Sequence, residues 1–227
     1  MPGVPRELAE HHLRVDPKAK LVKEHLRRSA TEKRKAIGEE VARLLTAKFI
    51  REIYHSEWLS NVVMVPKKDK SLRMCIDFKH INRVCPKDHF PLPRIDQIVD
   101  STMGCEHLSF LDAYSGYHQI RLFGPDEIKT TFITPFGCFC YITMPFGLKN
   151  AGATFMRMIQ KCLLHQIPRN VEAYMDDIVV KSRKGSDLLS DLAETFANLR
   201  RYDIKLNPTK CTFSVPGGKL LYFLISE

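Results

Sequence analysis

The sequence predicts an α+β fold, in which antiparallel strand pairs and helices occupy separate stretches of the chain. Strand pairs flank short turns in three stretches, at residues 61–78, 129–144 and 171–180. Apolar residues recur at helical intervals in three others, at residues 29–49, 148–164 and 186–199. This mixture of separate strand pairs and helices indicates an α+β fold. The chain has 227 residues and is 44% hydrophobic, which suffices for a sizeable core.

The first 30 residues are polar, and we expect them to be extended and poorly packed. They include a basic stretch formed by Lys18, Lys20, Lys23, Arg27 and Arg28. This stretch is either a solvated arm or a contact to a nucleic-acid backbone, and the solvated arm is the simpler interpretation. Ser29 and Glu32 then have the spacing of a capping box, which predicts the start of the first helix.

The first strand pair is a predicted hairpin with a basic tip. Residues 61–65 are mostly β-branched, residues 67–71 form a charged turn, and residues 72–78 alternate apolar and polar side chains. The chain then continues with a short helix near residues 95–99 and a buried strand at residues 108–112. Ser186 is the expected cap of the last helix, and the final strand candidates are residues 204–206 and 220–225.

The charge balance favours polyanionic partners. The formal net charge is +9 and the isoelectric point is near 9.2. Lysine and arginine near phosphates release bound counterions, although a basic protein without such a partner is an equal alternative from charge alone. The seven cysteines include no C-x-x-C pair, which disfavours a zinc site. No apolar run approaches the roughly 20 residues of a membrane helix, so we expect an intracellular protein without a membrane partner.

Two adjacent acids, Asp176 and Asp177, lie between apolar strand-forming residues. Most such pairs only form turns, because aspartate tolerates tight backbone geometry. Asp112, however, ends an otherwise apolar strand, where a carboxylate has no packing role. If the two segments pair, three carboxylates meet at one sheet edge. Such a cluster suits Mg²⁺, with Mn²⁺ as an alternative, and two ions about 4 Å apart can clamp a phosphoryl transfer.

Three segments in this order carry a family resemblance. They are residues 110–117 (Phe-Leu-Asp-Ala-Tyr-Ser-Gly-Tyr), 144–151 (Met-Pro-Phe-Gly-Leu-Lys-Asn-Ala) and 174–177 (Tyr-Met-Asp-Asp). They resemble the successive motifs of reverse transcriptases, and more narrowly those of Ty3/gypsy-type long-terminal-repeat retrotransposons, particularly plant ones. The resemblance runs from Leu8 to Glu227 and so covers nearly the whole chain.

The resemblance implies a right-hand polymerase with fingers and palm, in which helices flank the antiparallel palm sheet. An N-terminal extension and helix would occupy residues 1–50. The fingers would comprise residues 51–87 and 120–149, and the palm residues 88–119 and 150–227. The family pattern continues with a thumb, which we expect this chain to lack.

The resemblance also assigns roles to single residues. Asp112, Asp176 and Asp177 would be catalytic and bind the metal ions. The incoming nucleotide would be bound by Lys67, Arg73, Ala113, Tyr117, Phe146 and Gly147, with Tyr117 excluding a 2′-hydroxyl. The primer would contact Tyr174, Met175, Leu221 and Tyr222. The family usually has glycine at the position of Tyr222, so a bulky side chain there could disturb the primer-guiding strand.

The expected function is that of an RNA-directed DNA polymerase, which adds deoxynucleotides to a primer 3′-hydroxyl on an RNA or DNA template. Its partners would be the primed template, deoxynucleoside triphosphates, and other parts of a retroelement polyprotein or further copies in an oligomer. One alternative is a truncated remnant that folds and binds nucleic acid without catalysis. Another is an RNA-copying RNA polymerase, which Tyr117 disfavours because it would exclude the 2′-hydroxyl of a ribonucleotide.

Overall fold

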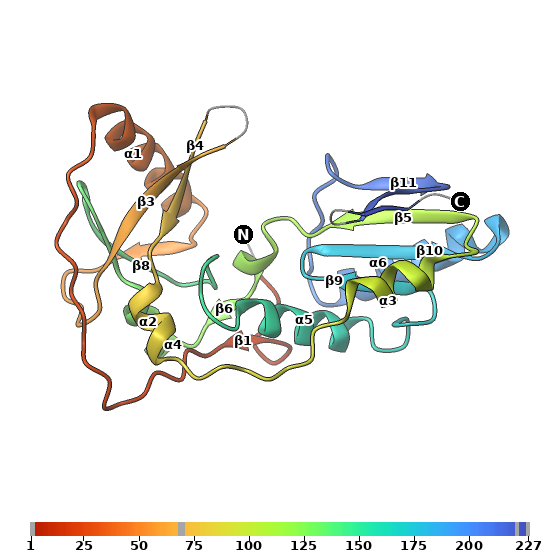
Figure 1. Cartoon of the computed structure of the whole chain (residues 1–227), viewed down its shortest axis with the longest axis horizontal. Coiled ribbons are helices and arrows are strands. Elements are labelled where there is room, and N and C mark those ends of the chain that lie inside the picture. The colour runs from red at the N-terminus through yellow and green to blue at the C-terminus, as the bar shows by residue number, and fades with distance from the viewer. Residues whose placement is uncertain (1–2, 68–70, 221–222, 226–227) are drawn as a thin grey trace. The chain divides into compact units, whose positions relative to one another are not determined.

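The computed structural model describes residues 3–67, 71–220 and 223–225. Contacts within the chain divide it into two units (Figure 1). The first unit contains residues 10–88 and 120–151, and the second contains residues 2–9, 89–119 and 152–227. Residues 10–50 lie within the first unit, and their description as an N-terminal extension and helix stays a prediction. The assignment of fingers and palm to these residues stays a prediction.

The main sheet of the first unit contains the predicted basic hairpin. Its strand order is β2-β8-β7-β3-β4, with bounds Ile50–Glu52, Gly137–Tyr141, Phe132–Thr134, Ser60–Pro66 and Leu72–Ile76. β3 and β4 pair antiparallel, whereas β3 and β7 run parallel. The predicted hairpins at residues 61–78 and 129–144 are thus both present, and they meet along the parallel edge that β3 shares with β7.

The N-terminal segment is extended as expected, but the prediction that it is poorly packed was wrong. Its strand β1 (Glu10–His11) pairs in parallel with β6 (Arg121–Leu122). Val4, His11 and Leu13 are buried, with at most 2% of each residue exposed. Farther along, the backbone of residues 22–24 is hydrogen-bonded to Leu59. These partners are distant in sequence, so local polarity gave no sign of them.

Three α-helices accompany the sheet of the first unit within the described residues, namely α1 (Thr31–Thr46), α2 (Lys79–Val84) and α4 (Gly124–Glu127). Ile37, Val41 and Leu44 form the buried face of α1. The predicted capping box is absent, because the N-cap is Ala30 and no side chain caps the helix. The helix begins at Thr31, one residue later than it would if Ser29 were its cap.

The second unit is built on a sheet that carries the acidic strand ends. Its strand order is β11-β5-β10-β9, with bounds Thr212–Val215, His107–Asp112, Asp177–Ser182 and Val171–Tyr174. All of its pairings are antiparallel. A further hairpin joins β12 (Gly218–Leu220) to β13 (Phe223–Ile225). β11 was not predicted, and the predicted strand at residues 204–206 is only an isolated bridge between Leu206 and Ala113.

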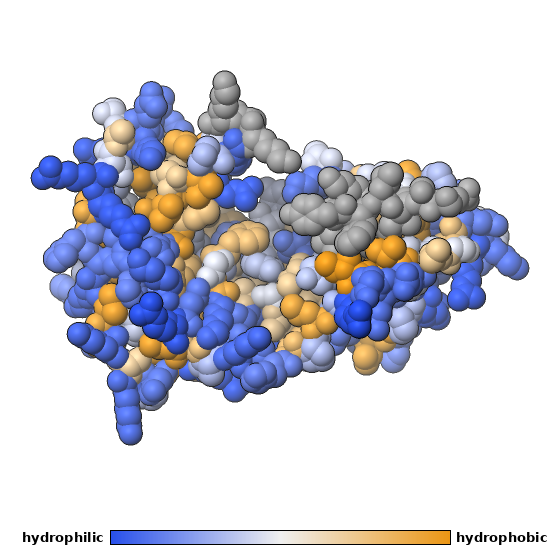
Figure 2. All heavy atoms as spheres, in the orientation of Figure 1, coloured by the Kyte–Doolittle hydropathy of each residue, from blue (hydrophilic) through white to orange (hydrophobic). Residues whose placement is uncertain are grey.

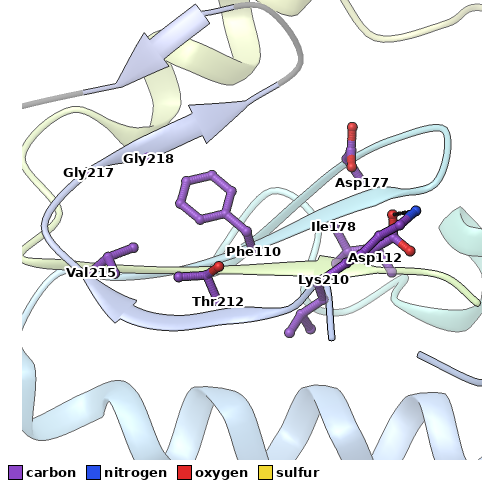
Figure 3. Close-up of a pocket in the computed structure, with 10 residues that line it drawn as sticks. Phe110, Asp112, Asp177, Ile178, Lys210, Thr212, Val215, Gly217 and Gly218 are labelled. Carbon is purple, nitrogen blue, oxygen red and sulfur yellow. Dashed lines mark hydrogen bonds and ion pairs between the residues drawn. The ribbon is translucent and has the colours of Figure 1, made fainter. Parts of the chain in front are cut away.

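Helices cover both faces of this sheet. Ile98 of α3 (Ile95–Thr102) packs on Leu108 and Val179, with Phe110 and Tyr174 at the margin of the cluster. α6 (Leu188–Arg201) lies against the opposite face, as Figures 1 and 3 show. Side chains alternate along β10, so Ile178 and Val180 are buried on the face opposite to Val179. The fold is therefore α+β, as the sequence predicts.

The two C-terminal helices begin later than the sequence predicts. α5 spans Ala151–Cys162 rather than starting at residue 148. α6 has Asp187 as its N-cap without a side-chain hydrogen bond, and Ser186 lies in a preceding 3-10 turn, so Ser186 is not the cap.

Hydrophilic side chains cover much of the face shown in Figure 2. Across the described ranges, no helix has the length and apolar character that crossing a membrane requires.

Candidate active site

Asp112 and Asp177 are cross-strand neighbours at the end of the second unit's sheet. β5 ends at Asp112 and β10 begins at Asp177, and the antiparallel register places these residues opposite each other. Asp177 is also paired with Tyr174, the last residue of β9. All six residues of β5 pair with β10, and a slip by one residue would turn every side chain of one strand to the other face. This pairing therefore fixes the positions of the two acids.

The turn between β9 and β10 consists of Met175 and Asp176. Met175 has a φ of +53°, in the left-handed region that residues other than glycine seldom adopt. Its backbone N–H donates to the sulfur of Met156 in α5, at 3.0 Å. The backbone N–H of Ala113 donates to the carbonyl oxygen of Asp176, at 3.0 Å. The turn is thus attached to α5 on one side and to the end of β5 on the other.

The Asp176 carboxyl lies in an environment that disfavours its charged form. Burial, followed by the charges of Asp112 and Asp177, raises the pKa of Asp176 to about 6, and Lys210 opposes that shift. Burial and Asp112 likewise raise the pKa of Asp177. Oδ1 of Asp176 is buried and has no hydrogen-bond partner among the described residues. That atom faces Gly116, where an added Cβ would collide with it.

Lys210 supplies the positive charge beside these acids. Its Nζ lies 3.3 Å from Oδ2 of Asp112, and the contact is drawn as a dashed line in Figure 3. A pocket of about 290 Å³ lies beside the pair, and Phe110, Asp177, Thr212 and Gly218 contribute to its lining. In Figure 3 the Asp177 carboxylate lies apart from the Asp112–Lys210 pair.

The donor chemistry of this site fits a divalent cation. Carboxylate oxygens are the ligands that Mg²⁺ prefers. The pKa values of Asp176 and Asp177 are raised first by burial and then by neighbouring carboxylates, and a bound cation would counter both effects. Oδ1 of Asp176, buried and without a hydrogen-bond partner among the described residues, could be a ligand of such a cation. However, no three His, Cys, Asp or Glu side chains in the described part of the chain are gathered closely enough to hold an ion. The three-carboxylate metal site therefore stays a prediction.

Tyr117 lies next to the acidic turn. It belongs to a 3-10 turn, Gly116–Gln119, and its ring centroid is 5.6 Å from that of Phe155. Its hydroxyl donates to the sulfur of Met175 at 3.7 Å. Burial, with smaller contributions from Asp176 and Tyr174, raises the pKa of Tyr117 to about 12. The hydroxyl is therefore protonated at neutral pH.

The predicted site residues are divided between the two units. The second unit brings together Asp112, Ala113, Tyr117, Tyr174, Met175, Asp176 and Asp177. Lys67, Arg73, Phe146 and Gly147 belong to the first unit. Of these, Lys67 and Arg73 are exposed on the β3–β4 hairpin, and Gly147 has a φ of +91° that favours glycine. Leu221 and Tyr222 lie outside the described residues.

Lys210 is a site residue that the sequence reasoning missed. The Asn207 N–H donates to the Asp112 carbonyl at 2.8 Å, and the Lys210 N–H donates to the Asn207 carbonyl at 3.1 Å. These bonds place the 207–210 turn beside β5. The turn-forming residues Asn207, Pro208 and Thr209 were a local signal for a bend. Nothing local indicated that this bend would lie beside Asp112.

The sequence matches the family model described as reverse transcriptase (RNA-dependent DNA polymerase) over residues 65–223. The chain belongs to the reverse transcriptase family. It is 37% identical over 183 residues to the retrovirus-related Pol polyprotein from transposon 412 of Drosophila melanogaster. It is 33% identical over 197 residues to the transposon Tf2-3 polyprotein of Schizosaccharomyces pombe. These relatives confirm the resemblance to reverse transcriptases of Ty3/gypsy-type retrotransposons.

The aligned regions cover 78% and 86% of this chain but only 15% of each polyprotein. Among solved structures, the protease-reverse transcriptase of prototype foamy virus is similar, with a TM-score of 0.85 and 19% identity over 96% of this chain and 29% of that chain. The foamy viral enzyme in complex with an RNA/DNA hybrid has a TM-score of 0.84, at 18% identity, over 97% of this chain and 30% of that chain. The fold is thus that of a reverse transcriptase. Members of this family use divalent metal ions.

Proposed function

We propose that this chain is an RNA-directed DNA polymerase domain of a retrotransposon polyprotein. The observation that carries the proposal is the cross-strand pairing of Asp112 with Asp177 at one sheet end, next to Asp176 of the turn, with raised pKa values for Asp176 and Asp177. The reaction is the addition of a deoxynucleotide to the 3′-hydroxyl of a primer. RNA or DNA is the template, since the foamy viral enzyme of the same fold forms complexes with an RNA/DNA hybrid and with double-stranded DNA.

Asp112, Asp176 and Asp177 are the proposed holders of two Mg²⁺ ions, which Mn²⁺ could replace. The bound ions would supply charge neutralisation at the attacking and leaving oxygens of the phosphoryl transfer. The protein positions the carboxylates through the β5–β10 register and through the bond from the Ala113 N–H to the Asp176 carbonyl. Lys210 balances part of the negative charge at Asp112.

Six residues are the proposed contacts to the incoming nucleotide. Lys67 and Arg73 are exposed cations, and a lysine point charge or an arginine fork suits phosphate oxygens. Tyr117 is the proposed barrier to a 2′-hydroxyl, with Ala113, Phe146 and Gly147 as further contacts to the nucleotide. Tyr174, Met175, Leu221 and Tyr222 are the proposed primer contacts. A net charge of +9 favours the polyanionic primer–template.

The test is extension of a labelled DNA primer on an RNA template, with deoxynucleotides and Mg²⁺. We expect Asp176→Asn to lower the rate by at least about 100-fold, since loss of one preorganised electrostatic group costs 10²–10³ in other enzymes. Asp100→Asn is the matched control, because Asp100 is an exposed acid of α3 and should have no effect. Unchanged extension by Asp176→Asn would refute the proposal.

The same assay separates the two alternatives. Binding of primer–template without any extension, at high protein and Mg²⁺ concentrations, would favour a remnant that binds nucleic acid without catalysis. Extension with ribonucleotides in preference to deoxynucleotides would favour an RNA-copying RNA polymerase.

A further inference from the structure

Gly152, in the first turn of α5, lies directly against the side chain of Met175. A Cβ added to Gly152 would lie 2.9 Å from Cε and 3.0 Å from Sδ of Met175, and 3.7 Å from the hydroxyl oxygen of Tyr117. Carbon atoms that are not bonded prefer about 3.5–4.0 Å. The present position of the Met175 side chain therefore requires that residue 152 has no side chain.

The Met175 side chain also contacts Tyr117. Its sulfur accepts the hydroxyl hydrogen of Tyr117 at 3.7 Å, while the Met175 backbone N–H donates to Met156 of α5. Met156 is 1% exposed, so this anchor is part of the core. The thioether of Met175 is thus held between the bare face of Gly152 and the hydroxyl of Tyr117, one residue before Asp176.

We propose that Gly152 is a positioning residue for sugar discrimination. By leaving room for Met175, it determines where the thioether lies under the Tyr117 hydroxyl, and Tyr117 is the barrier to a 2′-hydroxyl. This inference rests on the proposed function. Gly152 acts through Met175 and Tyr117 and touches no reacting atom.

Gly152→Ala can show whether Gly152 positions Met175 or only stabilises the fold, because the two roles predict different effects on thermal stability. The atoms that the new methyl group meets are the end of a flexible, half-buried methionine side chain, which moves more easily than backbone. Alanine also favours the helical conformation more than glycine does. The variant should therefore keep or raise its thermal midpoint, while Met175 shifts and disturbs the Tyr117 hydroxyl.

The experiment compares kcat/KM for a deoxynucleotide and for the matching ribonucleotide in primer extension. We expect Gly152→Ala to lower this discrimination ratio about 10-fold, the scale of one methyl-sized change in a binding pocket. In the Met175→Ala background, adding Gly152→Ala should change the ratio less than twofold, because the colliding thioether is gone. Gly124→Ala is the matched control, since a Cβ at Gly124 meets no atom within 4 Å.

A second measurement reports the contact without catalysis. In protein labelled with ¹³C at the methionine methyl groups, Gly152→Ala should shift the Met175 resonance, and Gly124→Ala should not. An unchanged Met175 resonance overturns the inference. So does an unchanged discrimination ratio in a Gly152→Ala variant of an active wild type. A wild type that extends no primer overturns the proposed function itself, and the inference with it.

Discussion

Asp112 and Asp177 lie directly opposite each other on adjacent antiparallel strands, each at the end of its strand nearest the Met175–Asp176 turn. Like charges opposite each other destabilise a sheet unless a counter-charge is near. Here Lys210 contacts Asp112, and Asp176 adds a third carboxyl from the turn. This clustering of carboxyl groups lowers the stability of the folded chain, and its effects on pKa values and on the free energy of unfolding can be measured.

The first prediction concerns pH and Asp176. The pKa of Asp176 is about 6 in the folded chain, above its usual 3.8, so the folded chain binds this proton more tightly than the unfolded chain. The stability that Asp176 contributes is present below about pH 4 and is lost as pH rises through about 6. At pH 7, Asp176→Asn should therefore raise the free energy of unfolding by about 1–2 kcal/mol.

Chemical denaturation of wild type and Asp176→Asn between pH 4 and 7 measures this difference. The two proteins must be compared because His11 also makes the stability depend on pH in this range. Burial lowers the pKa of His11 to about 4, so the contribution of His11 to stability rises with pH, whereas that of Asp176 falls. Mg²⁺ should raise the wild-type thermal midpoint at pH 7 and raise that of Asp176→Asn less. A difference in the free energy of unfolding between the two proteins that does not vary with pH would contradict the prediction.

The second prediction concerns Lys210. Because Lys210 opposes the raised pKa of both Asp176 and Asp177, Lys210→Gln should raise these pKa values further. The pair with Asp112 is mostly exposed on the lysine side, at 64%, so the loss of stability should stay below about 1 kcal/mol. Titration of the carboxyl ¹³C resonances reads out the shift. Lys184→Gln, at an exposed lysine, should leave the Asp176 titration unchanged.

The third prediction concerns the buried ion pair of β9 and β10. Nζ of Lys181 lies 2.7 Å from Oε1 of Glu172, and the two side chains are only 7% and 11% exposed. Lys181→Met should lower the free energy of unfolding by about 3 kcal/mol or more, because it leaves Glu172 buried without a partner. Adding Glu172→Leu should recover most of that loss.

Urea unfolding measures both Lys181 variants. The control is Lys35→Met, which removes an exposed pair with Glu39 at 3.9 Å and should cost no more than about 0.5 kcal/mol. Equal losses for Lys181→Met and Lys35→Met would show that burial of the pair has no energetic effect.

The fourth prediction concerns Tyr117. If its ring excludes a 2′-hydroxyl, Tyr117→Ala should lower the preference for deoxynucleotides at least about 10-fold, and Tyr117→Phe should largely keep it. With a pKa near 12, Tyr117 stays protonated, so the wild-type preference should not change between pH 6 and 9. Competition between a deoxynucleotide and its ribonucleotide in primer extension is the measurement. A preference that survives Tyr117→Ala would rule out this role.

The sequence by itself determined the α+β class, the predicted hairpins and the family, because these depend on local alternation and on motifs of a few adjacent residues. The tertiary structure decided which distant residues meet. Lys210 reaches Asp112, Gly152 makes room for Met175, and residues 22–24 bond to Leu59, each across more than 20 residues of chain. Such contacts follow from strand register and helix packing, which no local pattern encodes. The helix starts also depended on the tertiary structure, because neither Ser29 nor Ser186 caps the helix that it was expected to cap.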